Sequence, residues 1–241
     1  MMQQIAQEYR TATSRLLLLD YDGVLAPIVS RPEQAAPSGQ VRDLLSRLAA
    51  PAHTTVVVIS GRDQATLEGW LGDLEIDMSA EHGHFTKENG QWSESAALDM
   101  SWRDDVDAAM REIVQEYPGS HVETKQASIV WHYRQVHDPV DETAALARIT
   151  HAVAGRAEVM PGKCVIDVRA RGADKGRAAL HWLEMKQWDF VLSIGDDVTD
   201  EAMFAALPES AWTIKVGDGE TEAAYRLETQ PQVVDLLKIL D

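Results

Sequence analysis

RLLLLDYDG, residues 15–23, is a short apolar run that ends in two aspartates and a glycine. Such a run predicts a buried parallel strand that delivers polar groups at its carboxyl end. TTVVVISGR at residues 54–62 and WDFVLSIGDD at residues 188–197 repeat the pattern. Residues 41–50 have helical spacing of apolar positions, and residues 63–72 also suit a helix. Alternating strands and helices predict βαβ units in a parallel sheet with helices on both faces.

The middle of the chain has a different pattern. Residues 85–95 have hairpin features around an Asn-Gly pair, and residues 121–134 and 157–170 resemble hairpins with internal turns. Two helical stretches, at about 102–116 and 139–154, separate these hairpins. Together they predict an antiparallel sheet with helices on one face.

The two patterns predict an α/β fold with a discontinuous core. We expect a Rossmann-like parallel core from residues 1–84 and 170–241, and an inserted α+β domain from residues 85–169. In parallel sheets of this kind, ligands bind beyond the carboxyl ends of the strands. The polar ends of the three core strands should therefore meet at one site.

Composition limits the environment and the partners of the chain. Its 241 residues are 45% apolar, enough for a substantial core, and its single cysteine excludes an internal disulfide. Neither a signal-peptide core nor an apolar run of about 20 residues occurs, so we expect a soluble, cytoplasmic chain without a membrane partner. The formal charge of −17 disfavours nucleic-acid binding. An anionic substrate would therefore need local positive charge or a metal.

The first strand is followed by Asp20 and Asp22, separated by one residue, and by Gly23, which lets the backbone turn out of the sheet. By itself this pattern is equally typical of an Asx-rich turn. Three further polar segments follow along the chain: SGR at residues 60–62, ADKG at 173–176 and GDDVTDE at 195–201. Their presence and order favour a catalytic site.

Each segment provides a group that phosphate-ester hydrolysis requires. The carboxylates of Asp20, Asp196 and Asp200 can supply the oxygen ligands that Mg²⁺ prefers. A bound Mg²⁺ would also offset their mutual repulsion and the negative charge of the chain.

The remaining groups suit the transfer of the phosphoryl group itself. Asp20 can attack phosphorus to give an aspartyl-phosphate, and Asp22 can protonate the leaving alcohol and later deprotonate water. Ser60 and Lys175 offer a hydroxyl and a positive charge to the nonbridging oxygens. Taken singly, Lys175 is more typical of a solvated surface residue and Ser60 of a turn. Together with the aspartates they predict a phosphate site.

The segments DYDGVL, SGR, ADKG and GDDVTDE, in this order, resemble the four motifs of the haloacid dehalogenase superfamily, and the inserted domain resembles its large α/β cap. More narrowly, DYDGVLAPIV, VVVISGR, SAEHG, SIVWHYR, VMPGK and GDDVTDEAMF resemble the trehalose-6-phosphate phosphatase family. This likeness covers nearly the whole chain. It implies a haloacid dehalogenase fold and Mg²⁺-dependent hydrolysis of trehalose 6-phosphate to trehalose and phosphate.

The resemblance also implies a role for each acidic residue. Asp20 would be nucleophile and metal ligand, Asp22 would be the acid and base and give a backbone carbonyl to Mg²⁺, and Asp196 would be a carboxylate ligand. Asp197 and Asp200 would support the metal.

Two details complete the expected phosphate site. Gly61 joins Ser60 and Lys175 as a phosphate-binding residue. Val24 stands where the family usually has threonine, so one hydroxyl near the phosphate is lost but no obligatory group is removed.

Residues of the inserted domain should select the sugar, because a phosphate site alone cannot do so. Glu123 and Lys125 lie on one face of a predicted strand, and His132 shares that geometry with Arg134. By the family resemblance, Glu123, Lys125 and Glu158 match residues that contact glucose hydroxyls, and we add His132 to the predicted substrate-binding set. Alternating charges on the solvated face of a sheet are an equally ordinary explanation.

Four further residues are predicted to contact substrate from the core: Arg62, Glu81, His82 and Gly83. The last three form a polar segment at a strand end, where a hinge or a substrate wall would lie. Arg62 follows the phosphate-site residues directly, and it could instead hold that loop through a salt bridge.

Three alternatives to trehalose 6-phosphate hydrolysis stay open. The chain could act on another glycosyl phosphate, such as glucosylglycerol phosphate or a glycosyl-3-phosphoglycerate, and the cations Lys125, Arg134 and Lys163 do not discriminate between these. It could be a noncatalytic sugar-phosphate-binding domain, although both aspartates of DYDG are intact. It could also be a phosphomutase. A trehalose-6-phosphate synthase is the expected functional partner.

Overall fold

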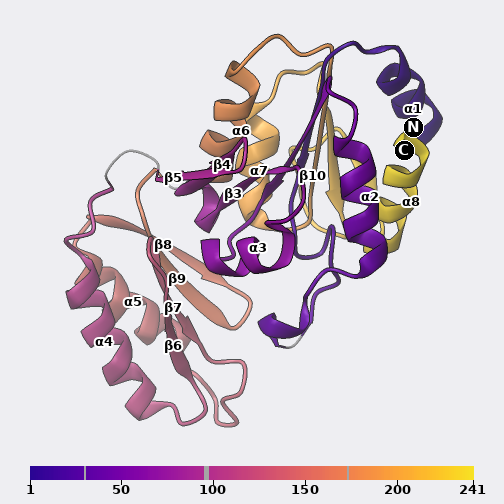
Figure 1. The fold of residues 1–241 in the computed structure, drawn as a ribbon. Coiled ribbons are helices and arrows are strands. Elements are labelled where there is room, and N and C mark those ends of the chain that lie inside the picture. Colours follow the sequence, from indigo (N-terminus) through magenta and orange to yellow (C-terminus); the bar gives the residue numbers. More distant parts are fainter. Residues whose placement is uncertain (30, 95–97, 173) are drawn as a thin grey trace. The chain divides into compact units, whose positions relative to one another are not determined.

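The computed structural model describes residues 1–29, 31–94, 98–172 and 174–241. The chain forms two compact units (Figure 1). The core unit comprises Met1–Glu94 and Asp174–Asp241, and the inserted unit comprises Ser95–Ala173.

The core unit contains an eight-stranded sheet in the order β12-β11-β10-β1-β2-β3-β4-β5. Pairing is parallel from β12 to β3, and β4 and β5 are added antiparallel at one edge. The strands are β1 (Arg15–Leu19), β2 (Thr54–Ile59), β3 (Asp77–Ala80), β4 (Phe85–Glu88), β5 (Gln91–Glu94), β10 (Phe190–Gly195), β11 (Trp212–Val216) and β12 (Tyr225–Leu227).

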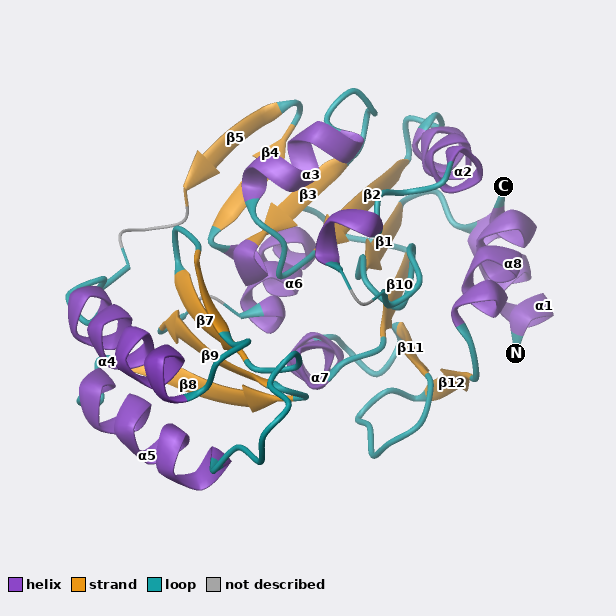
Figure 2. Cartoon of the chain, turned by 90° about the horizontal axis from the view of Figure 1, so that it is seen from below, coloured by secondary structure: helices purple, strands orange, loops and turns teal. Residues whose placement is uncertain are grey.

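Helices cover both faces of this sheet, as the sequence predicts. The core helices are α1 (Met2–Thr11), α2 (Gly39–Ala49), α3 (Gln64–Leu71), α6 (Lys175–Glu184), α7 (Val198–Ala206) and α8 (Gln230–Leu240). Alternate residues of β1 point to opposite faces, so Leu17 and Leu19 pack with α1, α2, α3 and α8, whereas Leu16 and Leu18 pack with α6 and α7. Figure 2 shows α1 beside α8.

The inserted unit is an antiparallel sheet in the order β6-β7-β9-β8. Its elements are α4 (Arg103–Glu116), β6 (His121–Thr124), β7 (Ser128–His132), α5 (Glu142–Val153), β8 (Ala157–Gly162) and β9 (Val165–Ala170). Both helices pack on one face of the sheet, around the fully buried side chains of Trp102, Trp131 and Ile149. This is the predicted α+β arrangement.

The boundaries between the two units differ from the expected ones. The hairpin β4–β5 was expected in the inserted domain, but it pairs with β3 and extends the core sheet. The first boundary therefore follows Glu94 rather than residue 84, and the second precedes Asp174 rather than residue 170. A hairpin signal predicts local pairing but not the sheet that the hairpin joins. No helix in the described ranges is long and apolar enough to span a membrane.

Candidate active site

The turn after β1 brings the DYDG segment against the GDD segment, residues 195–197, at the end of β10. Asp20 is buried, and Gly23 has a φ of +75°, which glycine adopts without strain. A Cβ atom on Gly23 would lie 2.1 Å from Oδ2 of Asp196. The absence of a side chain at Gly23 therefore leaves the space that the Asp196 carboxylate occupies.

Lys175, the first residue of α6, joins two buried carboxylates. Its Nζ lies 2.7 Å from Oδ1 of Asp20 and 2.7 Å from Oδ1 of Asp200. Lys175 is only 2% exposed, so this is an internal ion triad rather than the surface lysine that its sequence context alone would favour. Such a buried charge is stable only with its partners in place.

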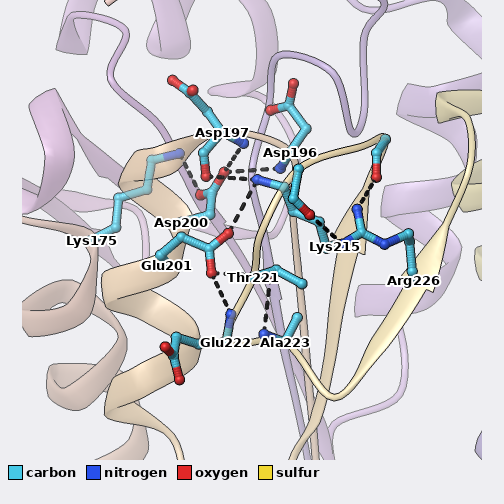
Figure 3. A network of polar contacts seen from close by, with 12 residues as sticks. Lys175, Asp196, Asp197, Asp200, Glu201, Lys215, Thr221, Glu222, Ala223 and Arg226 are labelled. Carbon is cyan, nitrogen blue, oxygen red and sulfur yellow. Dashed lines mark hydrogen bonds and ion pairs between the residues drawn. The ribbon is translucent and has the colours of Figure 1, made fainter. Parts of the chain in front are cut away.

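Asp200 is fixed by the first turn of α7 (Figure 3). Its Oδ2 accepts hydrogen bonds of 3.0 Å from the backbone N–H groups of Asp196 and Asp197, and Asp197 completes a capping box. Lys175 occupies the other oxygen. Both oxygens of Asp200 are thus engaged within the protein, whereas only Oδ1 of Asp20 is bonded to Lys175.

The packing of these carboxylates changes their acidity. Burial raises the pKa of Asp20 well above its usual value, the charge of Asp200 raises it further, and Lys175 opposes both effects. Burial and Asp200 likewise raise the pKa of Asp196 to about 6. Burial alone would lower the pKa of Lys175, but Asp20 and Asp200 raise it above its usual value, so the lysine stays charged.

The donor set of this cluster fits a divalent cation. One carboxylate oxygen from each of Asp20, Asp196 and Asp200 lies within 4.8 Å of the others. Three crowded carboxylates beside one lysine carry an excess of negative charge, and hard cations such as Mg²⁺ prefer oxygen ligands. Asp20 and Asp196 are the better placed ligands, because both Asp200 oxygens already accept hydrogen bonds.

Asp22 is held by Arg62. The Arg62 guanidinium donates to both carboxylate oxygens, from Nε at 2.8 Å and from Nη2 at 2.7 Å. The same guanidinium lies over the ring of Trp70, 4.6 Å from its centroid. The structure thus shows the salt bridge that the sequence left as one of two options for Arg62, and a direct substrate contact by this residue stays a prediction.

The predicted phosphate loop follows β2, beside β1 in the sheet. Ser60 is buried, and its Oγ accepts a hydrogen bond of 3.1 Å from the Arg62 N–H. A Cβ atom on Gly61 would lie 2.6 Å from the His82 ring, so the lack of a side chain at Gly61 admits this histidine. The structure brings these two predicted segments together.

The tripeptide from Glu81 to Gly83 forms a tight 3-10 turn after β3. All three residues have positive φ, and Glu81 and His82 are not glycines, so the turn has a strained backbone. The Glu81 N–H donates to the carbonyl of Arg62, and the His82 N–H to that of Ser60. The turn therefore lies against the predicted phosphate loop, and its contact with substrate stays a prediction.

A second ion network supports the acidic segment GDDVTDE, residues 195–201 (Figure 3). This network was not predicted from the sequence. Lys215 on β11 is buried; its Nζ donates to the carbonyl of Asp197 at 3.1 Å and lies 3.2 Å from the Glu201 carboxylate. Glu201 also accepts from the hydroxyl of Thr221 and the N–H of Glu222. A single lysine within the otherwise apolar strand WTIKV is the sequence signal that could have indicated a buried ion pair.

In the inserted unit, three predicted sugar-contacting residues lie together. Nε2 of His132 lies 2.9 Å from Oε2 of Glu123, and Nζ of Lys125 lies 3.9 Å from Oε1 of Glu123. Hydrogen bonding from His132 lowers the pKa of Glu123. His121, opposite His132 in the β6–β7 register, stacks on its ring at 4.8 Å.

Asp167 belongs to the same face, and it was not among the predicted residues. It lies on β9 opposite Val130, which is opposite Glu123. Burial raises the pKa of Asp167, and its buried Oδ1 has no hydrogen-bond partner among the residues that the structure describes. The alternation of VIDVR, with Ile166 and Val168 in the core, was the signal that could have identified it.

The remaining predicted residues have clear positions. Glu158 on β8 is 3.4 Å from Nε of Arg169, and Nη2 of Arg134 donates to the Lys163 carbonyl. Trp131 and Tyr133, which alternate with polar residues along the chain, pack in the core beneath the helices.

Val24 is fully buried among core side chains, so its apolar character suits its surroundings. The ADKG segment begins at residue 173, which lies outside the described residues.

Comparison with known proteins supports this description. Residues 18–230 match the family model described as trehalose-phosphatase. A bifunctional trehalose-6-phosphate synthase/phosphatase of Thermoproteus tenax is 43% identical over 93% of this chain and 31% of its own length. The chain spans about a third of the length of the curated relatives that it matches.

Solved structures give the same result for the fold. The C-terminal domain of the Candida albicans trehalose-6-phosphate phosphatase matches with a TM-score of 0.91 and 33% identity, over 99% of this chain and 96% of that chain. A haloacid dehalogenase-like hydrolase from Bacteroides thetaiotaomicron, 15% identical, matches with a TM-score of 0.66 over 95% of this chain and 100% of that chain. The expected haloacid dehalogenase fold is confirmed.

Proposed function

The chain belongs to the trehalose-phosphatase family, and from this we propose that it hydrolyses trehalose 6-phosphate to trehalose and phosphate through an aspartyl-phosphate. The observation that carries the proposal is the cluster of buried Asp20, Lys175 and Asp200 with half-buried Asp196, at the carboxyl ends of β1 and β10. A carboxylate held in place by a lysine, beside acidic metal ligands, suits nucleophilic attack on a phosphate ester.

In the first step, Asp20 would attack phosphorus and the bond from phosphorus to the sugar oxygen would break. Lys175 binds Oδ1 of Asp20 and so orients Oδ2 for the attack. Asp22 would give a proton to the departing sugar oxygen. In the second step, Asp22 would take a proton from water, and the water oxygen would attack phosphorus. The bond from phosphorus to the Asp20 oxygen would break, which regenerates the free Asp20 carboxylate and gives inorganic phosphate.

Mg²⁺ is the proposed cofactor. When bound, it would neutralise charge on the phosphoryl oxygens and on the acidic cluster. Asp20 and Asp196 would hold it with carboxylate oxygens and Asp22 with its backbone carbonyl, while Asp197 and Asp200 would support the loop. Ser60, Gly61 and Lys175 would hold the phosphate group itself.

The sugar would be recognised by the polar face formed by Glu123, Lys125, His132 and Asp167. Carboxylates and an ammonium group can accept from and donate to several sugar hydroxyls at once. The unpaired Oδ1 of Asp167 is a buried acceptor that needs a donor. Glu158, Arg62 and the turn from Glu81 to Gly83 are further proposed contacts.

The test is phosphate release from a panel of sugar phosphates with Mg²⁺, using the wild type, Asp20→Asn and, as control, Asp43→Asn on the exposed face of α2. We expect trehalose 6-phosphate to be the best substrate and only Asp20→Asn to be inactive. Full activity of Asp20→Asn would exclude the proposed nucleophile. Equal rates on all sugars would contradict sugar selection, and isomerised product without phosphate would indicate a mutase.

A trehalose-6-phosphate synthase is the proposed functional partner, because a relative that is 43% identical has a name that includes both activities. Direct transfer of substrate is not required by this proposal. A cytoplasmic location is also proposed, and it rests on the sequence alone.

A further inference from the structure

A pocket of about 540 Å³ lies at the opposite end of the core sheet from the acidic cluster. It is formed by the C-terminal turns of α1, α2 and α8 and by Arg15, the first residue of β1. Asp20 directly follows the last residue of β1, so the strand, about 17 Å long at 3.3 Å per residue, separates the pocket from the candidate active site. A ligand in this pocket cannot contact the reacting atoms.

The pocket is rich in positive charge, although the chain carries a formal charge of −17. Four cationic side chains line it: Arg10, Arg15, Arg47 and Lys238. Arg47 pairs with Asp241 at 2.7 Å, and Lys238 with Asp235 at 3.4 Å. Within the described residues, Arg10 and Arg15 have no acidic partner.

Helix ends explain three of these cations but not the fourth. Arg10, Arg47 and Lys238 lie in the last turns of their helices, where positive charge is favoured by the helix dipole. Arg15 lies on a strand and is only 9% exposed. Its guanidinium lies 4.2 Å from the ring centroid of Tyr9, which covers one face without accepting the N–H donors in the guanidinium plane.

The donors of Arg15 are poorly used. In the described part of the chain, its buried Nε has no hydrogen-bond partner, and its Nη2 makes only a long hydrogen bond of 3.5 Å to the Arg10 carbonyl. A buried charged donor without an acceptor is costly, and a guanidinium fork fits an oxyanion well. Asp241, the acidic residue of the pocket lining, is paired with Arg47, so among the described residues no carboxylate is paired with Arg15.

We propose that this pocket is a second ligand site, which binds the phosphate group of a small metabolite. A phosphate dianion matches the two unpaired guanidiniums of Arg10 and Arg15 in charge, and arginine binds phosphate through paired donors. Leu48, Pro51 and Ile239 provide an apolar wall beside the cations, and the volume admits a small organic group as well as the phosphate. The ligand acts on the core from outside the reaction site, by stabilising the ends of α1, α8 and β1.

The test is a titration of isotopically labelled protein followed through its backbone amide resonances, so that binding is located as well as detected. Inorganic phosphate and glucose 6-phosphate are the two probes. The variants are Arg10→Gln, Arg15→Gln and, as control, Arg111→Gln, which removes an exposed arginine of the inserted unit. Arg10 is exposed, so its variant keeps the test valid even if Arg15→Gln fails to fold.

We expect the amides of residues 9–15 and 236–240 to shift on addition of a probe, separately from any shifts near Asp20. The affinity for the probe, read from the shifts of these amides, should fall about tenfold or more in both pocket variants, because each loses a charge-assisted hydrogen bond. It should stay unchanged in Arg111→Gln. Stronger binding of glucose 6-phosphate would identify a phosphate ester as the ligand, and equal binding would identify phosphate itself. The proposal is overturned if neither probe shifts these amides, or if Arg10→Gln binds like the control.

Discussion

Arg62 holds the carboxylate of Asp22 through two hydrogen bonds, at 2.8 Å and 2.7 Å, and its guanidinium is itself packed over Trp70. Asp22 is the proposed acid and base, and the two hydrogen bonds from Arg62 fix the orientation of its carboxylate. A fixed carboxylate can exchange protons only with groups along one direction. Arg62 is therefore a positioning residue for proton transfer in addition to any contact with substrate.

Replacing Arg62 by methionine should impair the step that needs an acid. We expect kcat for trehalose 6-phosphate to fall about 10- to 100-fold, less than the roughly 10²- to 10⁴-fold of a complete general acid–base contribution, because Asp22 itself remains. With p-nitrophenyl phosphate, whose leaving group needs no proton, the loss should be smaller. Rate measurements on both substrates test this.

Arg148→Met is the matched control for Arg62, because Arg148 also donates two hydrogen bonds to carboxylates, those of Glu112 and Glu116 in the inserted unit. Its effect on both substrates should be small. Equal losses on the two substrates in Arg62→Met would contradict a role in positioning the acid.

Lys175→Met should leave Asp20 and Asp200 without their cation. Breaking a buried ion pair by removing one partner costs about 3–5 kcal/mol, so the free energy of unfolding should fall by about this amount. Urea unfolding with and without Mg²⁺ measures the effect, and Mg²⁺ should restore part of the loss because it neutralises the same carboxylates. Lys186→Met, at an exposed lysine, is the control. A Lys175→Met protein as stable as the wild type would show that the triad does not support the fold.

Asp196 should make the metal-free protein less stable as pH rises. Its pKa is raised to about 6 in the native state, against about 3.9 in an unfolded chain. The stabilising contribution of the protonated form is complete below pH 4 and is lost as pH rises to about 6, with a total on the order of 2–3 kcal/mol.

The measurement is the difference in unfolding free energy between wild type and Asp196→Asn, at several pH values in chelator. The unfolding free energy of the wild type should fall relative to that of Asp196→Asn between pH 4 and 6, and the difference should become constant above that range. Asp218→Asn, at an exposed residue, gives the baseline. A constant difference across this range would contradict the raised pKa, and added Mg²⁺ should abolish the shift.

Gly23→Ala tests whether the DYDG turn positions Asp196. The new Cβ would lie 2.1 Å from the carboxylate oxygen at a φ of +75°, so both the carboxylate and the backbone must move. We expect weaker Mg²⁺ binding by calorimetry and loss of most activity. Gly69→Ala is the control: nothing lies within 4 Å of its Cβ, and the change should stabilise α3 by about 0.5–1 kcal/mol. Unaltered Mg²⁺ affinity in Gly23→Ala would contradict the steric argument.

The sequence predicted much of the fold because its signals are local. Strands β1, β2 and β10 are apolar runs with polar ends, and each lies where its pattern predicts. Contacts between segments that are far apart in the sequence, whether strand pairing or ion pairs, leave no such local pattern. The placement of β4 and β5 in the core sheet, the Arg62–Asp22 salt bridge and the support of Asp197 by Lys215 all depend on tertiary contacts.

The polar face of the inserted unit gives the last prediction. Asp167→Asn removes the charge of a carboxylate whose Oδ1 is buried without a partner, so it should weaken binding of a sugar that donates to that oxygen. We expect KM for trehalose 6-phosphate to rise about tenfold, while the rate with p-nitrophenyl phosphate, which has no sugar, stays constant. Glu123→Gln should behave alike and also release His132 from its carboxylate partner. Asp104→Asn, at an exposed residue on α4 of the same unit, is the control. If Asp167→Asn changed the rates on both substrates equally, the residue would act on the fold of the inserted unit and not on the sugar.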